Sequence, residues 1–192
     1  MLDATNVLVG TPDQAAGTGA ILSAPLGTTL PTSVDDATTG FVDSGYISED
    51  GLQLANDLST TDIMDWSGSL VRRIKESFSG TLTWNQLETN AEALKNAFGD
   101  DAVTVTAATQ THGEQLAVAI KGELPAAKSW VFKIKDGDAK ILIVVPNGQV
   151  TSLGEVSFTA GDAIVWPVTL SAYPDSTGTS IYIYTDNGKV TA

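Results

Sequence analysis

The chain has 192 residues, 42% of them hydrophobic, a formal net charge of −13 and no cysteine. This length suits one domain with a sizeable core, and the lack of cysteine excludes disulfides, thiolate metal sites and cysteine nucleophiles. The longest uninterrupted apolar run, residues 141–146, is far shorter than the ~20 residues of a membrane-spanning helix. No basic segment followed by an apolar segment stands at the N-terminus, so we expect a soluble protein without a secretory signal.

The charges are unevenly distributed along the chain. Residues 1–71 contain ten acidic residues and no lysine or arginine, and the first three cations then come within four positions, at Arg72, Arg73 and Lys75. So acidic a chain is unsuited to wrapping nucleic acid, which requires clustered cations. The asymmetry suits a molecule whose acidic part meets a basic part of a neighbouring copy. An acidic surface that only keeps the protein in solution explains the same composition.

The N-terminal third lacks a clear periodic pattern. Residues 1–40 are rich in Gly, Thr, Ala and Pro, which predicts an extended arm, flexible over residues 1–20, with one short strand at residues 21–26. A second extended segment is expected at residues 40–48. The acid-rich segment 49–68 has no clean period and is expected to be a long loop, and such loops are usually functional or disordered.

Residues 70–84 alternate with the period of a strand. The apolar positions share one parity: Leu70, Ile74, Phe78, Leu82 and Trp84. This predicts a strand with one wet face, interrupted near Gly80. Arg72 and Glu76 fall on the apolar parity, so a bulge or the strand ends must bring them to water or to each other.

One helix is predicted over residues 89–98. Thr89 and Glu92 have the spacing of a capping box, in which each side chain satisfies a free backbone N–H group. Gly99 stands where a glycine commonly ends a helix.

The remainder alternates between short strands and turns. Strands are expected near residues 103–106, 116–121, 130–135, 140–145, 149–158, 163–173 and 180–185. Residues 136–139 and the pair Asn147-Gly148 are typical of hairpin turns. Strands at this spacing with one inserted helix predict a mainly β fold, a β-sandwich or barrel with an α-helix packed on it.

The sequence contains no recognisable catalytic or cofactor-binding pattern. His112 is the only histidine, and it stands beside a glycine in a loop-like segment, where a general base or zinc ligand is rare. There is no Gly-x-Ser-x-Gly elbow and no phosphate-binding glycine loop. We therefore expect no enzyme, no cofactor, no metal and no small-molecule substrate.

Six stretches, taken together and in this order, resemble the major tail tube protein of long, flexible-tailed (siphovirus-type) bacteriophages, particularly those infecting actinobacteria. They are APLGTTLPTSVDDA (24–37), GFVDSGYISEDGL (40–52), STTDIMDWSG (59–68), LETNAEALKNAFGDDAVTV (87–105), SWVFKIKDGDAKILIVVPNGQV (129–150) and AYPDSTGTSIYIYTDNGK (172–189).

The resemblance implies a structural virion protein of the β-sandwich or barrel type with one helix. It implies homohexameric rings that stack head to tail into a tube around a tape-measure protein, with tail-tip and tail-terminator proteins as further partners. DNA would pass through the lumen without specific binding, and no membrane is involved. The protein would be found in the virion tail, and in the host cytoplasm during assembly.

Residues of the acid-rich segment and the cations that follow it are the candidate subunit or ring interface. They are Glu49, Asp50, Asp57, Asp62, Asp65, Trp66, Arg72, Arg73 and Lys75. Acids of one copy would meet cations of another; alternatively, the two groups pair within one subunit.

Other functions remain open on the sequence alone. A β-sandwich adhesion or carbohydrate-binding module would be a stable monomer with exposed aromatic residues grouped on one face. A tube protein of a contractile tail or secretion machine would share the fold and the ring assembly. A hydrolase is the least favoured, because the acids and the single histidine lack the mutual spacing that catalysis requires.

Overall fold

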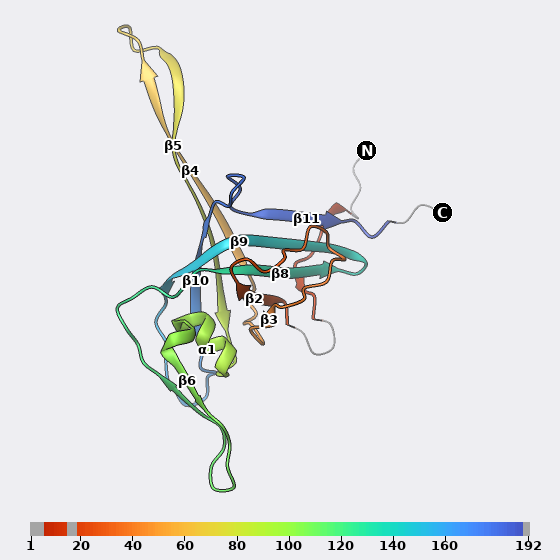
Figure 1. Ribbon diagram of the computed structural model, residues 1–192. Coiled ribbons are helices and arrows are strands. Elements are labelled where there is room, and N and C mark those ends of the chain that lie inside the picture. Colours follow the sequence, from red (N-terminus) through yellow and green to blue (C-terminus); the bar gives the residue numbers. More distant parts are fainter. Residues whose placement is uncertain (1–5, 15–18, 190–192) are drawn as a thin grey trace.

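The computed structural model describes residues 6–14 and 19–189 and shows a twisted antiparallel sheet from which one long hairpin projects (Figure 1). The main path of the sheet, in spatial order, is β3 (Val42–Asp43), β2 (Ile21–Pro25), β8 (Lys128–Asp136), β9 (Ala139–Leu153), β10 (Trp166–Tyr173), β5 (Leu70–Gln86) and β4 (Gln53–Met64). β1 (Thr11–Pro12) pairs with β8, and β11 (Tyr182–Asp186) pairs with β9. The mainly β fold is confirmed; the predicted arm 1–20 lies partly outside the described residues.

The strands at the centre of the sheet bury both of their faces. On β8, Trp130 and Phe132 enter the larger hydrophobic cluster, whereas Val131 between them enters a second cluster with Leu22 and Leu142. Part of the segment between β2 and β3 and the tyrosines of β11 pack against this second cluster. Burial on both faces explains why the sequence has near-continuous apolar runs here instead of alternation.

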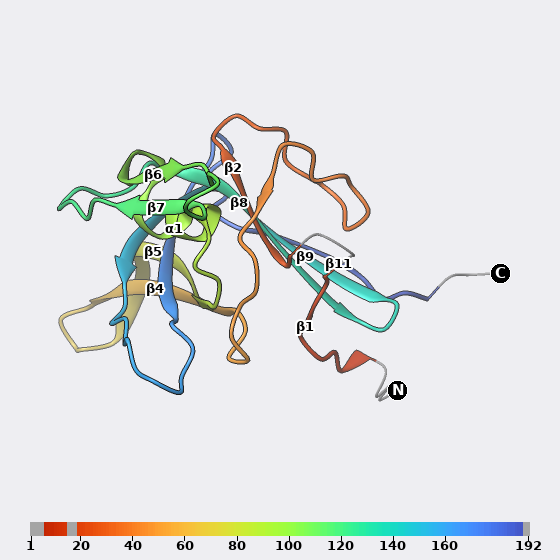
Figure 2. The same cartoon turned by 90° about the horizontal axis from the view of Figure 1, so that it is seen from below.

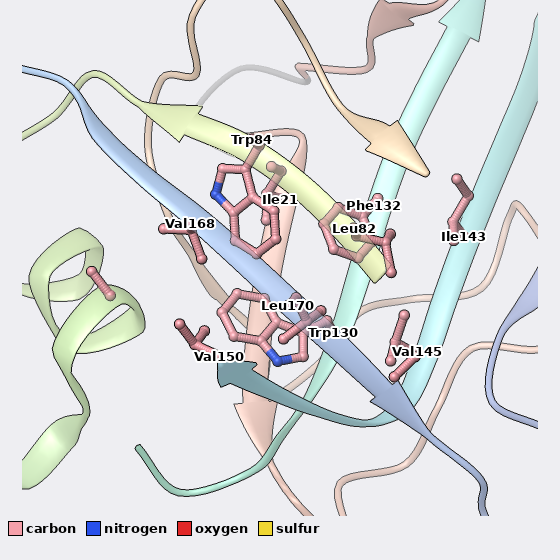
Figure 3. Close-up of a cluster of buried hydrophobic side chains, with 12 residues drawn as sticks. Ile21, Leu82, Trp84, Trp130, Phe132, Ile143, Val145, Val150, Val168 and Leu170 are labelled. Atoms are coloured by element: carbon pink, nitrogen blue, oxygen red, sulfur yellow. The ribbon is translucent and has the colours of Figure 1, made fainter. Parts of the chain in front are cut away.

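Aromatic side chains organise the larger cluster, which Figure 3 shows between β5, β8 and β10. The ring of Trp84 lies 5.3 Å from that of Trp130 and 5.6 Å from that of Phe132, measured between centroids, in tilted and edge-to-face arrangements. Such pairs contribute about 0.5–1.5 kcal/mol each beyond the area that they bury. The inner half of β5 is therefore fixed to the body by Trp84 and by Leu82, which is fully buried.

The helix α1 (Ala91–Phe98) begins two residues later than predicted. The prediction of a capping box formed by Thr89 and Glu92 is wrong. The N-cap is Asn90, whose Oδ1 accepts a hydrogen bond of 2.7 Å from the backbone N–H of Ala93. Thr89 instead accepts a hydrogen bond from the indole N–H of Trp166. Gly99 ends the helix, as predicted, with a positive φ of 98°. No helix within the described residues has the length and apolar character of a membrane span.

A short 3₁₀ turn, η2 (Asp100–Ala102), leads from the helix into a separate two-stranded sheet. This sheet pairs β6 (Val103–Thr106) with β7 (Gln115–Val118) in antiparallel register. In Figure 1 the β6 hairpin and α1 lie at the end of the molecule opposite the projecting hairpin.

Two expectations about turns and loops are wrong. Residues 53–64 of the expected acidic loop form the regular strand β4, which pairs with β5 along its whole length. Asn147-Gly148 is not a hairpin turn but lies within the continuous strand β9. The predicted turn at residues 136–139 is present, with Gly137 at a φ of 58°.

Gly148 is required by close packing and not by a turn. A Cβ atom at this position would lie 2.9 Å from the Trp130 ring and 3.1 Å from the Leu170 side chain, both of them buried. We predict that Gly148→Ala destabilises the fold by about 1–3 kcal/mol, the usual cost of overpacking a core. Denaturant unfolding would measure this. Gly122→Ala is the matched control, since nothing lies within 4 Å of its added Cβ, and an equal loss in both variants would contradict the explanation.

The turn between β10 and β11 is built on the carboxylate of Asp175. Its Oδ1 accepts hydrogen bonds from Thr177 N (2.8 Å), Thr177 Oγ1 (2.7 Å) and Thr179 N (3.1 Å), and its Oδ2 accepts one from the Tyr182 hydroxyl (2.8 Å). These bonds, led by those from the Thr177 and Tyr182 hydroxyls, lower the pKa of Asp175 to about 2.

A carboxyl group whose pKa is lowered by folding stabilises the fold above its unfolded-state pKa of about 3.9 and loses this contribution as the pH falls to its folded value. We therefore predict that Asp175→Asn lowers the thermal midpoint at pH 6, and that the difference from the parent narrows between pH 4 and the folded pKa of about 2. Glu114→Gln, in the exposed β6–β7 loop, serves as the control. A difference that is independent of pH would contradict this role for the carboxylate.

Candidate assembly surface

The hairpin of β4 and β5 continues well beyond the body of the molecule (Figure 1). Strand β5 also pairs with β10, but only from Gly80 to Gln86. Residues 57–79, here called the hairpin arm, therefore have no third strand beside them, and every residue from 60 to 79 is exposed. An isolated two-stranded ribbon is marginally stable in water, so the arm is expected to gain from a contact outside its own subunit.

The arm carries an unusual number of large apolar side chains in water. They are Leu58, Ile63, Met64, Trp66, Leu70, Val71, Ile74 and Phe78. Single exposed apolar residues are common, whereas eight of them on one projecting ribbon make the arm a candidate interaction site.

A change of register distributes these apolar residues over both faces of the arm. Leu58 pairs with Phe78, but after a one-residue shift Thr60 pairs with Lys75, which leaves Glu76 as an extra residue on β5. Lys75 consequently shares a face with Phe78, and its Nζ lies 5.6 Å from the centre of that ring, within the range of a cation–π contact. Glu76 turns to the other face.

The prediction of one apolar face, interrupted near Gly80, is therefore wrong: β5 runs through Gly80, and beyond the register shift Ile74 lies on the opposite face from Phe78. Glu76 accepts hydrogen bonds from the hydroxyls of Ser59 and Thr61. Although Glu76 falls on the apolar parity of the sequence, the bulge turns its side chain to the polar partners on the other face, as the sequence analysis allowed.

Most of the predicted interface residues lie together on this arm. Asp57, Asp62 and Asp65 come from β4 and the turn that follows it, and the three cations come from the facing strand. Glu49 and Asp50 are not on the arm: they precede β4 at the inner end of the β4–β5 pairing, where Asp50 accepts hydrogen bonds from Ser48 and Asn85.

One acid and one cation of this set pair within the subunit. Arg73 and Asp62 are cross-strand partners, joined by two hydrogen bonds of 2.6 Å from Nε and 2.9 Å from Nη2. The guanidinium group lowers the pKa of Asp62, and the carboxylate raises the pKa of Arg73. Arg72 forms no ion pair within the described residues and remains available to a partner.

The tip of the arm is a defined turn. The Asp65 carboxylate accepts hydrogen bonds from the Ser67 hydroxyl (2.7 Å) and the Ser69 N–H (2.8 Å), and these bonds lower its pKa. Gly68 supplies the positive φ of 81°. Trp66, the next residue after Asp65, is left completely exposed, with a relative accessibility of 105%.

The sequence analysis missed the apolar side chains of β4. Leu58, Ile63 and Met64 stand among acids and threonines without alternation, because no face of the arm is buried in its own subunit. The one feature of the sequence that could have indicated an interface here is that large apolar residues and many acids occur in the same segment.

A profile of the phage tail tube protein family matches residues 12–191. The chain belongs to this family. The tail tube protein is accordingly a structural component of a phage-like tail and not an enzyme. In the described part of the chain, no group of three or more acidic or histidine side chains is placed to hold a metal ion.

Among solved structures, this tail tube protein is similar to the tube-terminating cap of the anti-feeding prophage, with 15% identity, a TM-score of 0.48 and 94% of each chain covered. It is similar to a chain of the sheath–tube complex of an extracellular contractile injection system in its extended state, with 12% identity, a TM-score of 0.41 and coverage of 86% of this chain and 88% of that one. It is also similar to a chain from the tail of an empty gene transfer agent particle, with 10% identity, a TM-score of 0.41 and coverage of 93% and 99%. No match is found among curated proteins.

The internal ion pair of the arm can be tested in the separate subunit. We predict that Arg73→Gln raises the pKa of Asp62 towards its ordinary value, because the main cause of its lowering is the hydrogen bond from Arg73. Carboxyl titration by NMR measures this, with Arg72→Gln as the neighbouring control that leaves the bidentate pair intact. An Asp62 pKa that is unchanged in Arg73→Gln would show that the pair is not formed in solution.

Proposed function

We propose that this protein forms hexameric rings that stack head to tail as the tail tube of a long, flexible-tailed phage, and that the tube conducts DNA during ejection. The observation that carries the proposal is the hairpin arm, which exposes eight large apolar residues away from the body. A fold that leaves such a ribbon in water is best explained if the ribbon is buried against another copy.

The position of the arm supports a head-to-tail contact. It projects from one end of the molecule, whereas the opposite end carries α1 and the shorter β6–β7 hairpin, so the two ends present different surfaces (Figure 1). A contact between two different surfaces of the same chain is heterologous and builds either a closed ring or an open stack. A tube of stacked rings needs both kinds of contact, within a ring and between rings.

The predicted interface residues on and beside the arm belong to this proposal. Asp57, Asp65, Trp66, Arg72 and Lys75 would meet neighbouring subunits. Asp62 and Arg73 would help to hold the arm in shape, since they already pair with one another. Glu49 and Asp50 would contribute from the body, at the inner end of the β4–β5 pairing. Tape-measure, tail-tip and tail-terminator proteins would be the further partners in the virion.

One face of the sheet suits the passage of DNA. On the side of β5, β10 and β9 that points away from the core, Thr83 is opposite Thr169, and Thr81 is opposite Ser171. Ser171 and Thr151 of β9 are hydrogen-bonded through their hydroxyls at 2.8 Å. These side chains are uncharged, and a lining without lysine or arginine would not hold phosphates during transit.

Electron microscopy and light scattering of the purified protein over a range of concentrations test the proposal directly. Rings or tubes with a central hole and six subunits per ring are the expected result. A protein that stays monomeric even with tail-tip and tape-measure proteins added would instead favour a binding module. Assembly that depends on a sheath protein would favour a contractile tail.

Charge reversal on the arm gives a more specific prediction. Arg72→Glu should raise the concentration needed for assembly by about tenfold or more, because it replaces an available cation by a repelling acid at the contact, and each tenfold corresponds to about 1.4 kcal/mol. Arg72→Lys keeps the charge and serves as the control. Circular dichroism should show both variants folded, and normal assembly of Arg72→Glu would contradict a role for this residue in the contact.

A further inference from the structure

A second unpartnered apolar surface lies at the end of the molecule opposite the arm. It is a groove of about 360 Å³ between α1, the residues after β7 and the β9–β10 connection. Its lining includes Phe98, Ile120, Leu153, Phe158, Trp166 and Pro167. This volume is at the lower end of the roughly 300–1,000 Å³ of small-molecule pockets, which is sufficient for one aromatic side chain.

The aromatic walls of this groove are fixed in position. Trp166 makes edge-to-face contacts with Phe98 at 5.7 Å and with Phe158 at 6.2 Å between ring centroids. Its indole N–H donates a 3.0 Å hydrogen bond to Thr89 Oγ1 at the start of the helix. The mouth remains open, since Phe158 is 71% and Ile120 is 77% exposed.

Trp66 at the tip of the arm has the complementary shape and chemistry. Its indole ring is fully exposed, although the turn that carries it is fixed by Asp65 and Gly68. Aromatic side chains of this size bury 150–250 Å² when they are covered, and they dominate interfaces for that reason. Because the turn is already ordered, little conformational entropy is lost when it docks.

Each surface carries charges that suit the other, although neither has a single sign, since Asp65 adjoins Trp66 on the arm and Lys121 adjoins Ile120 at the groove. The arm presents Arg72 near its tip, and this cation has no ion-pair partner within its own subunit's described residues. Beside the groove lie Glu155 and Asp162, on the β9–β10 connection that also carries Phe158, and Glu123 lies nearby on the segment after β7. These three acids likewise form no ion pair in the described part of the chain.

Figure 1 shows the arm tip and α1, which forms one wall of the groove, at opposite ends of the molecule, and Figure 2, from below, shows α1, β6 and β7 together with the connection after β9. The arm of one subunit therefore cannot reach its own groove. It can reach the groove of a copy placed in line with it, which is the geometry of a stack.

We propose that the Trp66 side chain of one subunit inserts into the Phe98–Phe158–Trp166 groove of a second copy, with Arg72 beside the acids at its rim. This inference rests on the proposed tube assembly and specifies the pair of surfaces that joins successive subunits. The partner of the arm cations is then the acidic connection 154–165 of the next copy, and not the acidic segment 49–65.

Engineered disulfides test this contact. The chain has no cysteine of its own, so every disulfide that forms must join the introduced residues. Trp66→Cys and Phe158→Cys proteins, each of which lacks one of the contacting rings, are mixed at more than ten times the concentration at which the parent assembles, and are then oxidised. A covalent dimer is expected only in the mixture, because a heterologous contact brings Trp66 to Phe158 and not to a second Trp66. Val42→Cys, at an exposed apolar position on β3, replaces Phe158→Cys in the control mixture and should give no dimer.

Substitution of the inserted ring gives an independent measurement. Trp66→Ala should raise the concentration required for assembly by at least tenfold, whereas Trp66→Phe should recover most of the loss. Trp66 is fully exposed in the subunit, so both variants should unfold at the same denaturant concentration as the parent.

The outcomes separate this inference from the proposed function. Tubes that form normally with Trp66→Ala, or tubes in which no Trp66–Phe158 disulfide forms, would overturn the inference and leave the tube function intact. A parent protein that never assembles, even with its tail partners, would overturn both.

Discussion

The continuous backbone ladder between β4 and β5 is the constraint on which the rest of the structure depends. It begins inside the body, where Gln53 pairs with Thr83, and continues to Met64 and Leu70 at the tip. The inner part is held from both sides, because β5 also pairs with β10 and buries Leu82 and Trp84 in the core. In the outer part the two strands bond only to each other, so both outer edges and both faces of the ribbon are left in water. The body thus fixes the direction of an arm that cannot bury its own side chains.

The uneven charge of the sequence has a structural meaning in this hairpin. The last acids of the cation-free region and the first cations of the chain lie on facing strands, so Asp62 and Arg73 neutralise each other. Asp57, Arg72 and Lys75 form no ion pair within the described residues, and they stand on the arm among its exposed apolar residues. The body carries the surplus of acids, including those beside the Phe98–Phe158–Trp166 groove. The two ends of the subunit therefore differ in both shape and charge, which favours association in line over a symmetric dimer.

The sequence predicted those elements in which local pattern and tertiary environment agree. The buried strands, the helix with its glycine end and the turn at residues 136–139 were all recognised from local pattern. Errors arose where tertiary contacts override that pattern. Asn147-Gly148 has the composition of a hairpin turn, but the Trp130 ring packs against the backbone there and the strand runs through. Residues 53–64 have no alternation because the arm has no buried face, so a regular strand had the pattern of a loop.

By itself, the sequence determined the mainly β class, the family resemblance and the charge asymmetry, because composition and local alternation are properties of the chain and need no partner. It also singled out the residues of the arm as a candidate interface, although it could not show that the acids and cations face each other within one hairpin. Only the tertiary structure decided the register shift at Glu76, the internal Asp62–Arg73 pair and the full exposure of Trp66. The same holds for the groove, whose walls come from segments as distant as Phe98 and Trp166. Such features depend on which distant segments pack together, and local sequence pattern carries no information about that.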